Sequence, residues 1–145
     1  MNKRCTCGQE MDMTLRTVVH ARTIEIHHVP VYTCTCCDHS ELFPELKQDV
    51  IKLMKLLTND EATKRKRIYF DDEHEVASVL KECLDMGGDH LVDLFNNRVE
   101  ERVNHLLDIY LLAKTWGDVE WMIDIQRRLT QLTTFSATPY QVKIS

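Results

Sequence analysis

The sequence predicts an α+β protein, with a small β-hairpin head followed by a mostly helical domain of about four helices. Two β-branched runs near the N-terminus predict the hairpin, and apolar residues at helical spacing after residue 44 predict the helices. The chain has 145 residues, 43% hydrophobic and 28% charged. This composition suits one compact unit or two very small ones.

The head contains the two runs, 13–20 and 23–29, separated by Ala21-Arg22. Two alternating runs with a short polar break predict a β-hairpin. Pro30 then ends the second strand or confines it to a sheet edge, before residues 31–33 lead into a cysteine cluster. Because a lone hairpin is marginally stable in water, we expect something to fasten its ends.

The first two predicted helices are bounded by residues that start or stop helices. Pro44 begins the first, which ends near residue 59. Asp71 or Asp72 caps the second, and Gly87-Gly88 stops it.

Two longer helices follow. Asp89 begins the third, Gly117 breaks it, and Asp118 begins the fourth. Residues 133–145 are polar and rich in threonine, so we expect a frayed C-terminal tail.

Charge follows the same organisation. The hairpin domain, 1–43, carries 4 basic and 5 acidic residues, and the connecting helix and basic linker, 44–70, carry 7 and 4. The helical domain, 71–145, carries 7 basic and 14 acidic residues, so it is acidic. We expect these three segments to be the parts of the molecule.

Composition also excludes some classes of protein. With a net charge of −5, the protein as a whole is not an electrostatic nucleic-acid binder. No apolar run approaches the roughly 18 residues of a membrane helix, and the N-terminus lacks the apolar core of a signal peptide. We therefore expect a cytoplasmic protein without a membrane partner.

The cysteine pattern predicts a metal site. Five of the six cysteines fall within the first 37 residues, which in a reducing compartment indicates metal before disulfides. A Cys-x-x-Cys turn aims two thiolates at one ion, and Cys34 and Cys37 form such a pair. With Cys5 and Cys7 they make a four-thiolate structural zinc site that joins the two ends of the hairpin.

Alternatives remain at this site. Cys36 in place of Cys37 would mirror the first pair; otherwise it is a spare thiol. His27, His28 or His39 could replace one cysteine, and a disulfide or redox sensor is the rival chemistry. Because four thiolates close the site and no His-Glu-x-x-His run is present, we expect no enzymatic activity.

Three features occur together in the head: Cys5-Thr6-Cys7-Gly8, the hairpin, and the approach His28-Val29-Pro30-Val31-Tyr32-Thr33-Cys34 to the second cysteine pair. Through them, residues 5–43 resemble the MqsA/YgiT-type zinc finger. It implies that four cysteines hold structural zinc and that the domain binds a partner, as in antitoxins of toxin–antitoxin pairs. No helix-turn-helix pattern follows residue 44.

A basic run lies in the linker. Lys64, Arg65, Lys66 and Arg67 precede Ile68-Tyr69-Phe70, and such a run can hold phosphates while an aromatic ring stacks on a base. The alternative is a solvated linker whose charge is weakened by the acids of residues 71–75.

The helical domain offers a second candidate surface. Trp116 and Trp121 flank Gly117 and do not easily face one core direction, so one of them can serve a partner. Cys83 lies on an apolar helix face and is expected to be an inert core thiol. Residues 106–124 are similar to the short IDEAL helical segment of Gram-positive bacterial proteins.

These observations together predict a zinc-binding, non-enzymatic regulatory or adaptor protein that acts through contacts with a protein partner not named by the sequence. The alternative is a nucleic-acid-binding transcriptional or antitoxin-like regulator that uses residues 64–67.

Overall fold

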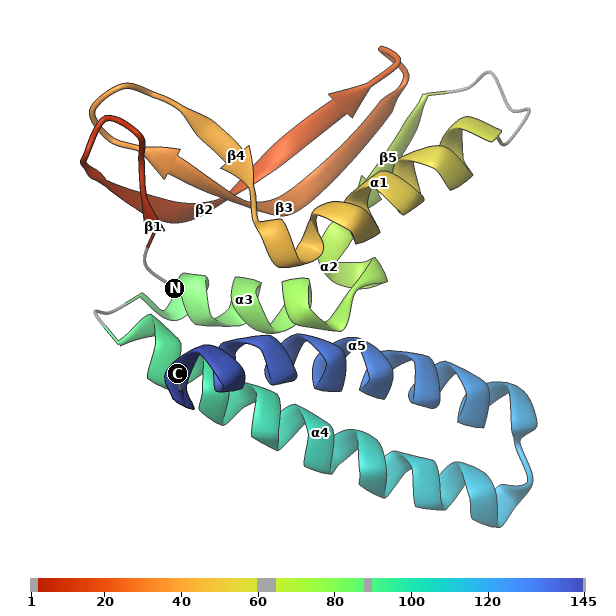
Figure 1. Ribbon diagram of the computed structural model, residues 1–145. Helices are drawn as coiled ribbons and strands as arrows, with labels where there is room; N and C mark the ends of the chain where they lie inside the picture. The colour runs from red at the N-terminus through yellow and green to blue at the C-terminus, as the bar shows by residue number, and fades with distance from the viewer. Residues whose placement is uncertain (1–2, 60–64, 88–89, 145) are drawn as a thin grey trace. The chain divides into compact units, whose positions relative to one another are not determined.

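The computed structural model describes residues 3–59, 65–87 and 90–144, with side chains described to residue 135 (Figure 1). The chain divides into two compact units, Met1–Glu73 and His74–Ser145. The first contains the β-sheet and the second contains the long helices. The predicted α+β class is therefore confirmed.

The first unit is built on a five-stranded sheet. Four strands pair antiparallel in chain order, and the fifth pairs parallel with β3. The strands are β1 (Lys3–Arg4), β2 (Glu10–His20), β3 (Ile24–Cys34), β4 (Ser40–Leu42) and β5 (Lys66–Tyr69). Because β2 occupies one edge of β3, β4 and β5 share its other edge. The predicted hairpin is present as β2 and β3.

Strand β3 continues through Pro30, which was expected to end it or confine it to an edge. Pro30 pairs with Leu15 of β2, and its carbonyl accepts a hydrogen bond of 3.1 Å from the N–H of Phe43. Proline lacks only the N–H donor, so one ladder bond is lost while the carbonyl still bonds.

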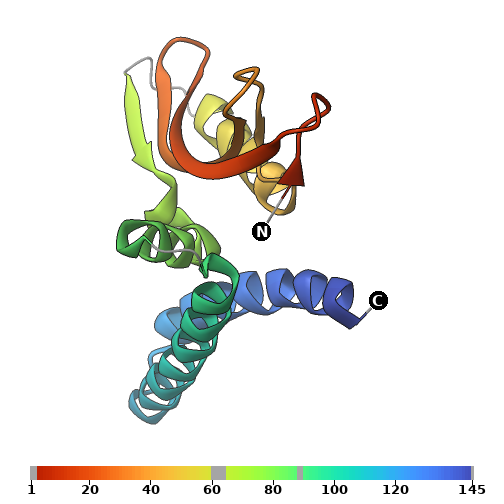
Figure 2. The ribbon, with the colours of Figure 1, turned by 90° about the vertical axis from the view of Figure 1, so that its left-hand side faces the viewer.

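The hairpin is strongly curved (Figure 2). The register of β2 and β3 shifts between Arg16 and Val18, and His28 on the facing strand has φ +60°. An extra residue on one strand bends a ladder and increases its twist, so this bulge accounts for the curvature.

Residues 44–70 belong to the first unit. Helix α1 (Pro44–Asn59) buries Leu46 and Val50, while β5 pairs with residues 24–27 of β3. The expected basic linker is thus partly a strand, and the expected boundary at residue 70 falls instead after Glu73, at the end of the one-turn helix α2 (Phe70–Glu73). Pairing of half-buried Ile68 with Ile26 explains the strand.

The second unit contains α3 (Glu75–Met86), α4 (Leu91–Trp116) and α5 (Val119–Ile144). The N-cap of α3 is His74, whose Nδ1 accepts a 3.1 Å bond from the N–H of Val76; the predicted caps Asp71 and Asp72 lie in α2 instead.

The glycine stops are observed in part. Gly87 follows α3 with φ +70°, and Gly117 ends α4 in the left-handed conformation, where its N–H meets the carbonyls of Ala113 and Lys114. Gly88 and Asp89, the rest of the predicted stop and start, lie outside the described residues.

The segment that was expected to be a frayed tail continues helix α5, which extends to Ile144. Leu132 and Phe135 are both buried, and the ring of Phe135 meets Phe95 of α4 edge-on at 5.3 Å. These apolar contacts stabilise turns whose threonines alone would not form a helix.

A buried ion-pair cluster joins the three helices. Glu75, at the start of α3, is 8% exposed, and its Oε2 accepts a 2.7 Å bond from Arg102 of α4. Its Oε1 accepts from Nε of Arg128 on α5, and its N–H donates to Gln131 at 3.0 Å. Arg102 also bonds Glu82. One carboxylate thus fixes the helices' mutual register.

Candidate metal centre

Two loops of the first unit bring four cysteines together. Cys5 and Cys7 lie in the loop between β1 and β2, Cys34 ends β3, and Cys37 lies in the loop before β4. Pairing of Met11 with Cys34 aligns the two loops at the same end of the sheet. Residues about 30 positions apart therefore meet because the hairpin returns the chain to its start.

The four sulfurs form a tight group. Their Sγ atoms all lie within 4.8 Å of one another, with Cys5–Cys37 and Cys7–Cys34 each 3.5 Å apart. A tetrahedral ion with metal–sulfur bonds of about 2.3 Å requires sulfurs roughly 3.8 Å apart. Disulfide bonds are near 2.05 Å, and all six cysteines are free. The group can hold a metal ion.

Geometry distinguishes Cys36 from Cys37, the two alternatives for the fourth position. Cys37 belongs to the group, whereas Cys36 is exposed and outside it. The backbone N–H of Cys36 instead donates to the sulfur of Cys34 at 3.4 Å. Cys36 therefore supports a neighbouring sulfur through its main chain and leaves its own thiol free.

The main chain shapes both loops for this purpose. Cys5 N–H bonds the carbonyl of Gln9 at 2.8 Å, and Gly8, with φ +93°, donates to the carbonyl of Cys5 at 2.9 Å. In the second loop the N–H of Cys34 bonds the carbonyl of His39 at 2.8 Å. Glycine adopts the positive φ of the first turn without strain.

Backbone donors and sulfur crowding set the thiol pKa values. N–H groups of Cys37 and Cys36 lower the pKa of Cys34 to about 6, and the N–H of Cys7 does most to lower the pKa of Cys5. Gln9 N–H acts to lower the pKa of Cys7, but the sulfur of Cys34, burial and two further sulfurs together raise it to about 12.

The pKa of Cys37, like that of Cys7, is raised by its neighbours. The N–H of His39 acts to lower its pKa, yet the sulfurs of Cys5 and Cys34 and burial raise it overall. The pKa values of two cysteines are thus lowered and those of the other two are raised. Crowding of like charges has this effect, because four neighbouring thiolates repel one another. A divalent cation among them would favour the thiolate at all four positions.

The three histidines considered as substitute ligands have other partners. Nδ1 of His27 lies 2.9 Å from the hydroxyl of Thr17, and Nδ1 of His28 lies 2.8 Å from Asp71. Nε2 of His39 lies 3.4 Å from Glu41. None of the three belongs to the group of four cysteines that could hold a metal ion.

Part of the basic run lies in a strand of the sheet. Lys66 and Arg67 are in β5, where Nζ of Lys66 donates to the carbonyl of Leu57 at 3.3 Å and Nε of Arg67 donates to Glu25 at 3.3 Å. Arg65 is exposed just before β5, and Lys64 lies outside the described residues. Of the neighbouring rings, Phe70 is buried and Tyr69 is 40% exposed.

In the second unit, Trp116 is 67% exposed, and its ring lies 6.0 Å from that of half-buried Trp121. Cys83 is buried, and burial raises its pKa, as expected for a core thiol.

The chain was compared with protein-family models, curated proteins and solved structures, and none of them matches it. Among the described residues, no helix combines the length and the apolar character needed to cross a membrane.

Proposed function

We propose that this protein is a zinc-binding, non-enzymatic regulatory or adaptor protein whose helical unit binds another protein. The cluster of four sulfurs within 4.8 Å carries the zinc part of the proposal. Four thiolates complete a tetrahedral shell, so no position is left open for a substrate or a catalytic water. Zinc here serves the fold of the sheet.

The donor set favours zinc among the metals. Tetrahedral sulfur sites in proteins hold zinc or iron, while calcium and magnesium prefer oxygen ligands. Zinc does not change oxidation state, which suits a site that only joins two loops. The resemblance of residues 5–43 to the MqsA/YgiT-type zinc finger supports the same assignment.

The protein-binding part rests on an exposed apolar surface of α4 and α5. Leu107 and Leu111 lie one turn apart on α4 and are 46% and 61% exposed. Val119 and Ile123 lie one turn apart on α5 and are 62% and 60% exposed. Exposed apolar side chains that gather on one surface mark interaction sites more often than isolated ones do.

The four side chains take no part in the polar contacts that join the three helices in the described part of the chain. Gln126 of α5 donates to the hydroxyl of Tyr110 on α4 at 3.2 Å. Arg102 of α4 and Arg128 of α5 both reach Glu75 of α3. The exposed apolar side chains of α4 and α5 are therefore available to a partner.

Metal analysis tests the zinc assignment. Protein purified without added metal should contain about one equivalent of zinc, and Cys5→Ser and Cys34→Ser should each lose most of it. Cys36→Ser is the matched control and should keep the metal, because Cys36 lies outside the group. Full retention in both ligand variants, or iron in place of zinc, would refute the assignment.

Photo-crosslinking tests the partner surface. A crosslinker at Leu111 should capture a discrete protein in cells, and Ile123→Glu should abolish that product because a carboxylate placed in an apolar contact is costly. Thr130→Glu adds the same charge at an exposed site of α5 and should leave the product intact. Equal capture by all three proteins would contradict specific binding.

A further inference from the structure

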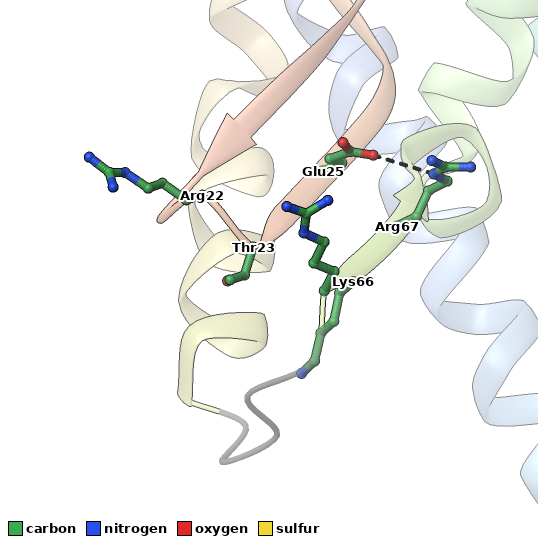
Figure 3. Close-up of a pocket in the computed structure, with 6 residues that line it drawn as sticks. Arg22, Thr23, Glu25, Lys66 and Arg67 are labelled. Atoms are coloured by element: carbon green, nitrogen blue, oxygen red, sulfur yellow. Dashed lines mark hydrogen bonds and ion pairs between the residues drawn. The ribbon is translucent and has the colours of Figure 1, made fainter.

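A basic hollow lies at the end of the sheet remote from the cysteines. It has a volume of about 420 Å³ and is lined by the β2–β3 turn and β5, through Arg22, Thr23, Glu25, Arg65, Lys66 and Arg67 (Figure 3). The volume falls within the usual range of small-ligand sites, roughly 300–1,000 Å³. Arg22, distant in sequence from the basic run, is brought beside it by the pairing of β3 with β5.

The described lining of the hollow leaves the charges of Arg22 and Arg65 without a carboxylate partner. Glu25 is the single carboxylate among the described lining residues, and it is already shared between Arg67 and His27, each at 3.3 Å. Figure 3 shows Glu25 turned toward Arg67, while Arg22 projects from the turn away from both. In the part of the chain that the structure describes, no carboxylate pairs with Arg22 or Arg65. The hollow therefore attracts an anion.

The backbone at Arg22 strengthens this point. Ala21 and Arg22 have φ +51° and +62°, in the left-handed region where hairpin turns favour glycine or asparagine. The turn itself calls for positive φ at both positions, and glycine or asparagine at residue 22 would meet that demand with less strain than arginine. Backbone strain of this kind is typical of functional positions.

A ring pair adjoins the hollow on the same face of the sheet. Arg67 and Tyr69 alternate along β5, so their side chains share one face, and exposed Arg65 lies just before the strand. Tyr69 pairs in register with His27 of β3, and their rings stack with centroids 5.2 Å apart. Tyr69 remains 40% exposed, which leaves ring surface for a ligand.

We propose that this face binds single-stranded nucleic acid, with Arg22 and Arg65 contacting phosphates and Tyr69 stacking on a base. A basic track beside exposed aromatic rings on a sheet is the combination that sequence-tolerant single-strand binders use. An acidic peptide would use the arginines but not the ring. The proposal is independent of zinc-dependent folding and of the apolar surface on α4 and α5.

Fluorescence anisotropy of the full zinc-loaded protein tests this proposal, with a labelled single-stranded oligonucleotide of about 12 nucleotides and mixed sequence. At about 50 mM salt we expect saturable binding, weakening as salt rises with a slope of about −0.7 per phosphate contacted. Unlabelled duplex of the same sequence, a poly-glutamate peptide and a mononucleotide serve as competitors. The unlabelled single strand should compete best.

One variant of the two arginines and two variants of Tyr69 separate the contribution of the charges from that of the ring. Arg22→Gly combined with Arg65→Ala should reduce the magnitude of the salt slope by about 1.4, because two phosphate contacts are removed. Glycine suits the positive φ at residue 22, so loss of binding cannot be ascribed to a damaged turn. Tyr69→Ala should weaken binding about fivefold or more with the slope unchanged, and Tyr69→Phe should restore it.

The matched control removes two exposed positive charges from α1, by Lys47→Ala and Lys52→Ala. It changes net charge as the arginine variant does and should keep nearly all of the binding. Equal losses in the two double variants, no binding at low salt, or competition by poly-glutamate or the mononucleotide as strong as by the single strand would each overturn the proposal.

Discussion

Glu75→Ala should destabilise the helical unit more than any exposed charge substitution. Charge-assisted hydrogen bonds contribute about 1.5–3 kcal/mol each, and Glu75 accepts one from Arg102 and one from Arg128. The arginine side chains are 18% and 29% exposed, so water solvates part of the charge that the alanine leaves unpaired. Arg102 also keeps Glu82 at 2.7 Å.

We therefore expect a loss of about 3 kcal/mol, toward the lower limit for breaking a buried ion pair. Glu75→Gln keeps one carbonyl acceptor and should cost about half as much. For a unit of this size, 3 kcal/mol lowers Tm by roughly 12–24 °C.

Urea unfolding followed by tryptophan fluorescence measures the effect in the correct unit, because Trp116 and Trp121 are the chain's two tryptophans and both lie in the helical unit. Glu101→Gln is the matched control: its 3.4 Å pair with Arg98 is exposed and should contribute under about 0.5 kcal/mol. A midpoint for Glu75→Ala within error of that control would refute the assignment of the cluster as the joint of the three helices.

Three further predictions concern single residues. Leu106 is fully buried between α4 and α5, so Leu106→Ala should cost about 2–5 kcal/mol in the same urea assay, and a smaller loss would contradict a close-packed core. Gly117→Ala should cost about 1 kcal/mol from its φ of +67° alone, because open space surrounds the new methyl group, and Gly117→Asn should cost less. Burial does most to raise the pKa of Tyr32 to about 12, so the folded state retains this proton above the ordinary pKa of 10; stability should fall between pH 10 and 12, and Tyr32→Phe should flatten that part of the denaturation profile.

The sequence predicted the hairpin, the start of α1 and the cysteine group, because each depends mainly on residues that are close together along the chain. The hairpin follows from alternation over 13–29, and helix α1 begins at Pro44 as expected. The four predicted ligands meet because cysteine spacing encodes the geometry of each loop, and the hairpin between them returns the chain. These features require no knowledge of long-range packing.

The features that the sequence concealed depend on contacts between distant segments. Strand β5 is short and strongly basic, and it becomes a strand only because Ile68 pairs with Ile26 of β3. The segment beyond residue 133 is polar on average, yet the ring of Phe135 contacts that of Phe95 on α4. From the sequence alone, Arg22 is an ordinary turn residue, and only the pairing of β5 with β3 brings it near the basic run. Tertiary contacts decided all three.

A single strand, β3, connects the cysteine group with the basic hollow. Cys34 lies at its C-terminal end, and Ile24, where β5 pairs, lies at its N-terminal end. Eleven residues give a contour of roughly 35 Å, so an ion at one end and an anion at the other do not compete for space. Loss of a metal ion held by the cysteines would free the two cysteine loops from each other, while β3 stays paired with β2 and β4 at that end and with β2 and β5 at the other. The basic hollow would therefore keep its backbone frame when the cysteine group is oxidised or loses its ion.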